Sequence, residues 1–216
     1  MKQIFCRSLL LAGVMALSLQ QAVAGSSQFI ENMPQLAQDM DRPGAMIWEK
    51  PGINRAAYTR VMIEPITIFI SPDSESKGLN ADELKTLSDG FREAVTKTLE
   101  PDIAVVNEKG PGVLYIRAAL TNVKVAKKPR GLLGYTPIGF VVTTAAGPQI
   151  SLKQAALEIE SLDSVSGERV GVLIDKAPKA AEKEELSWDS INKVMVYYAE
   201  RFKSRMESAK KASGTK

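Results

Sequence analysis

The sequence contains no histidine, and its one cysteine is Cys6. Without histidine there can be no Ser-His or Cys-His nucleophile–base pair, no His general base and no His-ligated metal. A Ser-Lys dyad stays formally possible, but no serine is set apart by its neighbours. The residue types therefore predict a protein that is not an enzyme, with no catalytic residue and no cofactor. A hydrolase lacking histidine is the alternative.

Two further patterns have the composition of a ligand site. The carboxylates of Asp73, Glu75, Asp82 and Glu83 could supply oxygen ligands for a hard cation. Their spacing fits no EF-hand loop, and the last two fall where a helix start favours acids, so we predict no metal site. Residues 110–112 read Gly-Pro-Gly but lead into a strand instead of a helix, which predicts a turn and no phosphate site.

The most unusual stretch is residues 127–142, where basic residues precede an apolar, glycine-containing run. Such a run could contact anionic lipid or an envelope protein partner, or it could fold back as a cap on the sheet. A long connection inside a compact domain is often functional. The candidate partner or lipid contacts are Lys127, Lys128, Arg130, Leu132, Leu133, Tyr135, Ile138 and Phe140.

The N-terminus has the pattern of a secretory signal. Lys2 and Arg7 precede an apolar run at residues 9–19, and small residues follow, which predicts cleavage between Ala24 and Gly25. The run is too short for the ~20 residues of a transmembrane helix, and no later segment is long enough. Without this segment, 26 basic residues face 25 acidic ones. A net charge so close to zero does not indicate a nucleic-acid-binding protein.

The mature chain shows a regular order of elements. β-Branched residues predict a strand over 58–70, in which Pro65 breaks the alternation and suggests an edge or a bulge. A helix over 80–99 follows, with apolar residues at helical spacing, and a short strand over 103–106. The long strand 113–125 places Tyr115, Arg117, Val123 and Val125 on one face. A hairpin joins the strands 151–162 and 169–175, and Ser187 begins a helix over 188–209.

This order predicts an α+β domain. We expect a mixed or antiparallel sheet of about five strands with the two main helices packed on one face. The domain organisation would be a signal peptide (1–24), an irregular N-terminal lead-in (25–57), a single α+β domain (58–209) and a basic flexible tail (210–216).

Four segments, in this order and spacing, resemble the domain-of-unknown-function 3313 family of bacterial envelope proteins, described as lipoproteins. The similarity spans residues 58–206 and rests on residues 63–65 with 71–74 and 78–99, on 110–114 with 120–123, on 162–168, and on Trp188, Ala199 and Arg201. The resemblance implies export and an envelope location, and brings no activity or catalytic residue. A lipoprotein carries a cysteine directly after the cleavage site, and here that residue is Gly25. We therefore expect a periplasmic protein without a lipid anchor.

These observations leave two main hypotheses for function. The first is a periplasmic, non-catalytic interaction or accessory module that binds a partner or the membrane surface through residues 127–142. The second is a carrier of a small apolar ligand or lipid, held between the sheet and the helices. The sequence gives neither the ligand nor the oligomeric state.

Overall fold

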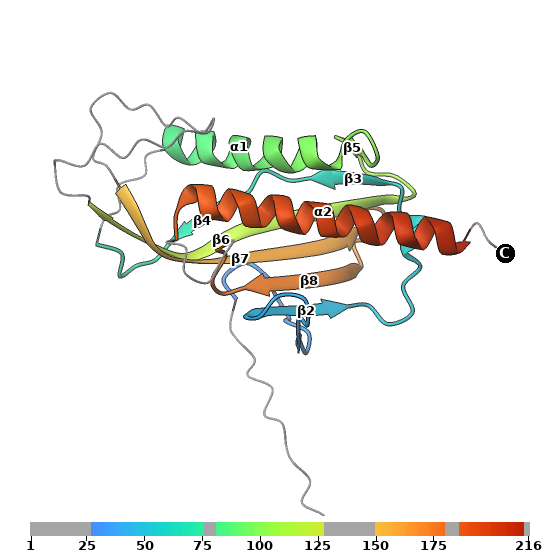
Figure 1. Cartoon of the computed structure of the whole chain (residues 1–216), viewed down its shortest axis with the longest axis horizontal. Coiled ribbons are helices and arrows are strands. Elements are labelled where there is room, and N and C mark those ends of the chain that lie inside the picture. The colour runs from blue at the N-terminus through green and yellow to red at the C-terminus, as the bar shows by residue number, and fades with distance from the viewer. Residues whose placement is uncertain (1–26, 76–80, 128–149, 180–185, 214–216) are drawn as a thin grey trace, which may run out of the picture.

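The computed structural model describes residues 27–75, 81–127, 150–179 and 186–213 (Figure 1). Ala24 and Gly25, between which cleavage is predicted, lie outside these ranges. Within them, the chain forms one mixed sheet with two α-helices on the same side, which confirms the predicted α+β class. In the same ranges, no helix combines the length and the apolar character needed to cross a membrane.

The sheet has eight strands, and seven of them follow the order β1-β2-β8-β7-β6-β3-β5. The eighth strand, β4, pairs with β6 on the same side as β3 but farther along β6. Pairing is parallel among β3, β4, β5 and β6 and antiparallel elsewhere. The strands are β1 (Ala37–Gln38), β2 (Ala45–Glu49), β3 (Arg60–Ile63), β4 (Thr67–Ile70), β5 (Ala104–Val106), β6 (Val113–Lys127), β7 (Ile150–Asp163) and β8 (Arg169–Asp175).

The single strand predicted over residues 58–70 is divided in two at Pro65, where an edge or a bulge was expected. β3 and β4 both run parallel to β6, the first beside residues 113–116 and the second beside residues 119–123. Proline has no N–H to donate to a sheet, so the ladder is interrupted between them. The chain then crosses over through α1 (Ala81–Leu99) and returns to the sheet at β5.

The faces of β6 differ from the prediction beyond its middle. Tyr115 and Arg117 lie on the face away from the helices, but Val123 and Val125 belong to the core beneath the helices. The cause is a bulge at Asn122, whose φ of 52° is left-handed and where the pairing with β7 shifts. One extra residue in a strand reverses the face of everything after it, and asparagine tolerates this conformation.

The N-terminal lead-in contains two strands, β1 and β2, which with the division of the 58–70 strand raise the count from about five to eight. Residues 45–49 form β2 and pair along their whole length with residues 171–175 of β8. The lead-in also contains β1 and a short 3-10 helix, η1 (Arg55–Ala57). The sequence interpretation missed β2 because the strand is stabilised by its pairing with β8, which local sequence does not reveal.

Both helices begin where the sequence indicated. α1 ends before Pro101, and α2 (Trp188–Ser213) starts after Ser187, whose Oγ accepts from the Ser190 N–H at 3.1 Å. α2 runs through Ser213, so its predicted end at 209 was too early. The main core lies between the helices and the sheet, with the fully buried side chains of Leu87, Phe91, Leu120, Leu157, Ile191 and Val194.

The opposite face of the sheet is partly covered by residues 27–32, which we call the N-terminal segment. Ile30 is buried, and the Phe29 ring centroid lies 5.0 Å from the Arg117 guanidinium carbon. Arg169 donates hydrogen bonds to the carbonyls of residues 31 and 32 at 2.7 and 2.8 Å. On the same face of the sheet, the buried carboxylate of Glu160 accepts hydrogen bonds from both Arg117 and Arg169. This face is therefore held by charged pairs, and the helix-covered face by apolar packing.

Candidate functional site: a groove beneath the last helix

The apolar stripe of α2 faces the sheet as predicted. Ile191, Val194, Met195 and Tyr198 are buried, and Phe202 is partly buried. The stripe continues to Met206, which is buried two turns beyond Tyr198. Spacings of three and four residues keep these side chains on one side of the helix.

Two helices cannot cover a sheet of this width. An α-helix is roughly 10 Å across, so two of them cover about 20 Å. Seven strands at a spacing of about 4.8 Å span about 29 Å. Among the described residues, α1 and α2 are the only α-helices. The helix-facing side of β8 and β2 is therefore left with open space beside α2.

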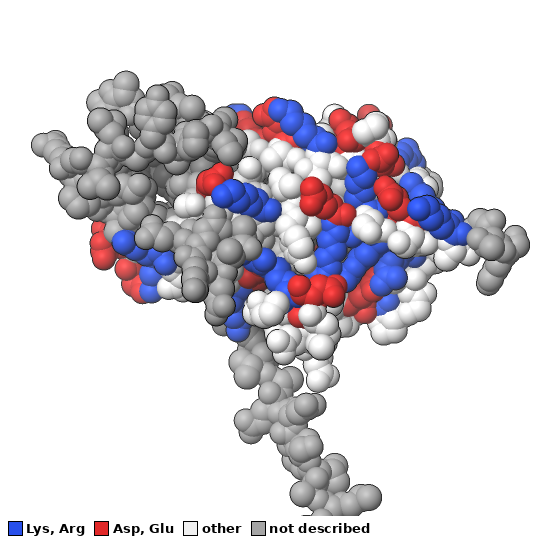
Figure 2. Space-filling view, in the orientation of Figure 1, with Lys and Arg blue, Asp and Glu red and all other residues white. Residues whose placement is uncertain are grey.

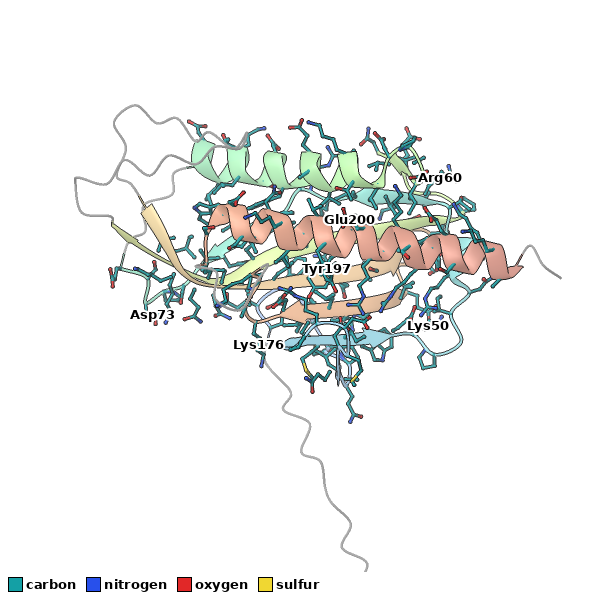
Figure 3. All side chains as sticks on the ribbon, viewed as in Figure 1. Lys50, Arg60, Asp73, Lys176, Tyr197 and Glu200 are labelled. Carbon is teal, nitrogen blue, oxygen red and sulfur yellow. The ribbon has the colours of Figure 1, made fainter. Side chains whose placement is uncertain are left out.

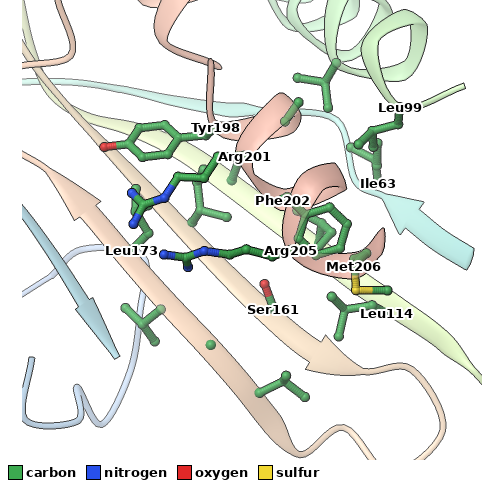
Figure 4. A pocket seen from close by; sticks show the side chains of 18 of the residues that line it. Ile63, Leu99, Leu114, Ser161, Leu173, Tyr198, Arg201, Phe202, Arg205 and Met206 are labelled. Atoms are coloured by element: carbon green, nitrogen blue, oxygen red, sulfur yellow. The ribbon is translucent and has the colours of Figure 1, made fainter. Parts of the chain in front are cut away.

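A groove of 230 Å³ occupies this space, between the C-terminal half of α2 and strands β6, β7, β8 and β2 (Figure 4). Its walls are mostly apolar. Its lining includes Ile47, Leu114, Ile116, Ile159, Ser161, Val170, Gly171, Leu173, Met195, Tyr198, Phe202 and Met206.

Two small residues make the floor of the groove hollow. Ser161 of β7 and Gly171 of β8 are register partners, so their side-chain positions lie next to each other on the same face. In Figure 4, the Ser161 side chain points toward α2. A Cβ at position 171 would meet its nearest atom at 3.6 Å, an ordinary contact, so the backbone itself does not require glycine there. The short side chain at position 161 and the lack of one at position 171 leave open volume above these two strands.

A buried cluster of three residues fixes α2 over β8 at one end of the groove, and we call it the Asp175 cluster. Asp175 Oδ2 accepts from Arg42 Nε at 2.6 Å and from the Tyr198 hydroxyl at 3.1 Å. The Arg42 guanidinium carbon lies 5.5 Å from the Tyr198 ring centroid, a cation–π distance. Burial raises the pKa of Tyr198, and the charge of Asp175 adds to this, so the hydroxyl remains a donor.

A second set of ion pairs joins the turn between β1 and β2 to the flank of α2. Arg201 binds both carboxylate oxygens of Asp39 and also donates to Asp41 at 2.7 Å. Hydrogen bonds from Arg201 hold the pKa of Asp39 below its usual value, against the effect of burial. Figure 3 shows Tyr197 on the same flank, and in Figure 2 positive and negative side chains are interspersed between α2 and β2. The turn is thus attached to the helix by charge.

We expect this attachment to weaken in acid. Because the pKa of Asp39 is lower in the folded chain than in the unfolded one, its contribution is complete above the unfolded value near 4 and is lost as the pH falls through the folded value. Asp39→Asn should cost about 2 kcal/mol of unfolding free energy at neutral pH. The difference from the wild type should shrink steadily toward acid, in urea unfolding followed by tryptophan fluorescence. If the difference in unfolding free energy between the variant and the wild type were the same at acid and at neutral pH, the Asp39–Arg201 pair would not be the cause.

The structure places few of the residues singled out in the sequence near this groove. Lys127 ends β6, where it pairs with Ile150, at the end of the sheet away from α2's C-terminus. The other candidate contacts in 127–142 lie outside the described residues, so binding through them stays a prediction. Asp73, also at that far end, forms an ion pair with Lys124 at 2.6 Å (Figure 3). Among the described residues, no three acids gather as a metal site would need.

Residues 110–112 form the predicted turn. The Val113 N–H donates to the Gly110 carbonyl at 3.1 Å, and Gly112 has a φ of 72°. A Cβ on Gly112 would lie 3.0 Å from the Ala57 carbonyl oxygen, so the close approach of η1 also requires glycine. The turn is a structural feature that brings η1 against the start of β6.

The sequence interpretation missed the groove residues Ser161, Gly171, Arg205 and Met206. One signal was available, because an isolated glycine inside a strand often marks a close approach or a ligand site. Another was the continuation of the α2 stripe to Met206. Neither signal alone reveals that these positions share one cavity, since that depends on the register between β7 and β8.

The chain belongs to the family described as protein of unknown function (DUF3313), whose model matches residues 25–202. This confirms the resemblance found in the sequence, and it is consistent with an envelope protein. No curated protein matches the chain significantly.

Three solved structures are similar to this chain. A PelC dodecamer from Paraburkholderia phytofirmans is 10% identical, with 73% of this chain and 94% of that chain covered and a TM-score of 0.36. A DUF4136 family protein from Bacteroides thetaiotaomicron is 13% identical, with 77% and 96% covered and a TM-score of 0.35. A DUF330 protein from Xanthomonas campestris is 7% identical, with 78% and 94% covered and a TM-score of 0.33.

Proposed function

We propose that this member of the DUF3313 family is a non-catalytic binding protein of the cell envelope that holds a single alkyl chain in the groove beneath α2. The observation that carries the proposal is the apolar groove over the small residues Ser161 and Gly171. Its 230 Å³ is below the ~300–1,000 Å³ of pockets for drug-sized ligands. That size suits one slender chain better than a ring system or a two-tailed phospholipid.

The driving force would be the transfer of methylene groups from water to the groove. Each buried methylene contributes about 0.8 kcal/mol, which corresponds to roughly a fourfold gain in affinity. Straight-chain alcohols from hexanol to decanol, titrated calorimetrically into delipidated mature protein, should therefore bind more tightly with each carbon until the groove is full. An affinity independent of chain length would contradict the proposal.

Filling the groove should abolish this binding without unfolding the protein. Ser161→Leu and Gly171→Leu each place a branched side chain where the chain would lie, and a Cβ at position 171 meets no close contact. We expect decanol affinity to fall about tenfold or more in each, because several methylenes lose their contact surface. Gln154→Leu is the matched control, since it adds the same side chain to an exposed position of β7, the strand that carries Ser161.

Unfolding temperatures measured on the same variants show whether each one is folded. Folded groove-filling variants that bind decanol as tightly as the wild type would overturn the proposal. Native mass spectrometry of wild-type protein purified from periplasm adds an independent test, because a retained ligand should be absent from Gly171→Leu and present in Gln154→Leu.

A further inference from the structure

Arginine side chains are concentrated around the groove. Four arginines line it, Arg55, Arg92, Arg201 and Arg205, and among the described lining residues Glu49 is the one acid. Three of the four have close partners. Arg55 forms two hydrogen bonds to Glu49, Arg92 donates to the Ile63 carbonyl and to Asn107 at 3.2 Å, and Arg201 binds Asp39.

Arg205 differs from these three. Among the described residues, its one ion pair is with Asp41 Oδ2, at 3.8 Å, and Arg201 already donates to that same oxygen at 2.7 Å. The Arg205 side chain is 46% exposed, whereas that of Arg201 is 14% exposed. Its guanidinium therefore keeps most of its donors available for another anion.

The Arg205 guanidinium lies next to the groove. Arg205 follows Arg201 by one helical turn, and the two guanidinium groups extend side by side from α2 toward β8 (Figure 4). Phe202 and Met206, three residues before it and one after, point into the groove. A chain lying between these side chains and Ser161 would place its polar end within reach of Arg205.

We propose that the ligand is a single-chain amphiphile with an anionic head group, and that Arg205 binds this head group at the mouth of the groove. The inference rests on the proposed alkyl-chain function and adds the chemistry of the polar end. A planar guanidinium can donate two parallel hydrogen bonds to a carboxylate or a phosphate. Of the nearby acids, Glu49 is bound by Arg55 and Asp39 by Arg201. Asp41 shares Arg201 with Asp39 and lies 3.8 Å from Arg205, but its side chain is 66% exposed, so water and salt screen its charge.

The test compares two probes with the same tail, decanoate and decanol, below the concentration at which decanoate forms micelles. At neutral pH and low salt, we expect the wild type to bind decanoate about tenfold more tightly, as one charge-assisted contact at a partly exposed site provides. Arg205→Gln should lower decanoate affinity about tenfold relative to decanol affinity, so that the preference for decanoate disappears. Lys193→Gln is the control, because it removes a charge elsewhere on α2, outside the groove, and should keep the preference.

The outcomes separate the two proposals. If decanol does not bind, the alkyl-chain function fails, and this inference fails with it. If decanol binds and the wild type shows no preference for decanoate, or Arg205→Gln keeps the preference, only the head-group assignment is overturned. Decyl phosphate as a third probe distinguishes the sources, since tighter binding than decanoate would indicate a lysophospholipid-like phosphate, and weaker binding a fatty-acid carboxylate.

Discussion

Asp175→Ala is expected to lower the unfolding free energy by about 3–5 kcal/mol, because it leaves the charge of Arg42 buried without a partner. The Asp175 side chain is 2% exposed and that of Arg42 is 14% exposed, so water cannot replace the lost carboxylate. The variant also removes the acceptor of the Tyr198 hydroxyl and of the Ala177 N–H. Urea unfolding followed by circular dichroism measures the change.

The control for this prediction is an aspartate in an exposed ion pair. Asp189 pairs with Lys193 one helical turn away, and both side chains are more than 40% exposed. Asp189→Ala should change the unfolding free energy by no more than about 0.5 kcal/mol. Equal effects for the two variants would show that the Asp175 cluster is not a buried charge pair. The double variant Asp175→Leu with Arg42→Met should recover most of the loss, since it removes both charges together.

Phe91→Ala is expected to cost about 3–5 kcal/mol, because it opens a cavity at the centre of the main core. Phe91 is fully buried and lies in the same cluster as Leu120 and Ile191, so the gap cannot be filled without moving a helix. The measurement is again urea unfolding. A cost below about 1 kcal/mol would mean that α1 is not packed on the sheet as described.

Phe202→Ala provides the functional counterpart of this core variant. Phe202 is only partly buried and lines the groove, so we expect a smaller loss of stability, about 1–2 kcal/mol. In contrast to Phe91→Ala, it should weaken decanol binding by roughly tenfold, because the ring forms part of the groove's roof. The pair of variants therefore separates residues that hold the fold from residues that hold the ligand.

Local patterns in the sequence determined much of this structure. The β-branched run before Pro65, the capped start of α2 at Ser187 and the hairpin over residues 163–167 are all present as predicted. They could be predicted because caps, turns and periodic apolar faces depend on residues within a few positions of one another. The missing histidine likewise restricted the possible chemistry before any fold was known.

Tertiary structure alone decided the features on which function is proposed. β2 forms because β8 offers it an edge, and Val123 changes face because of one bulge at Asn122. The groove exists because two helices are narrower than the sheet and because the β7–β8 register places Ser161 opposite Gly171. Each of these features depends on contacts between residues far apart in the chain, and no local sequence pattern predicts such contacts. The sequence therefore determined the class of the fold, while long-range pairing produced the cavity.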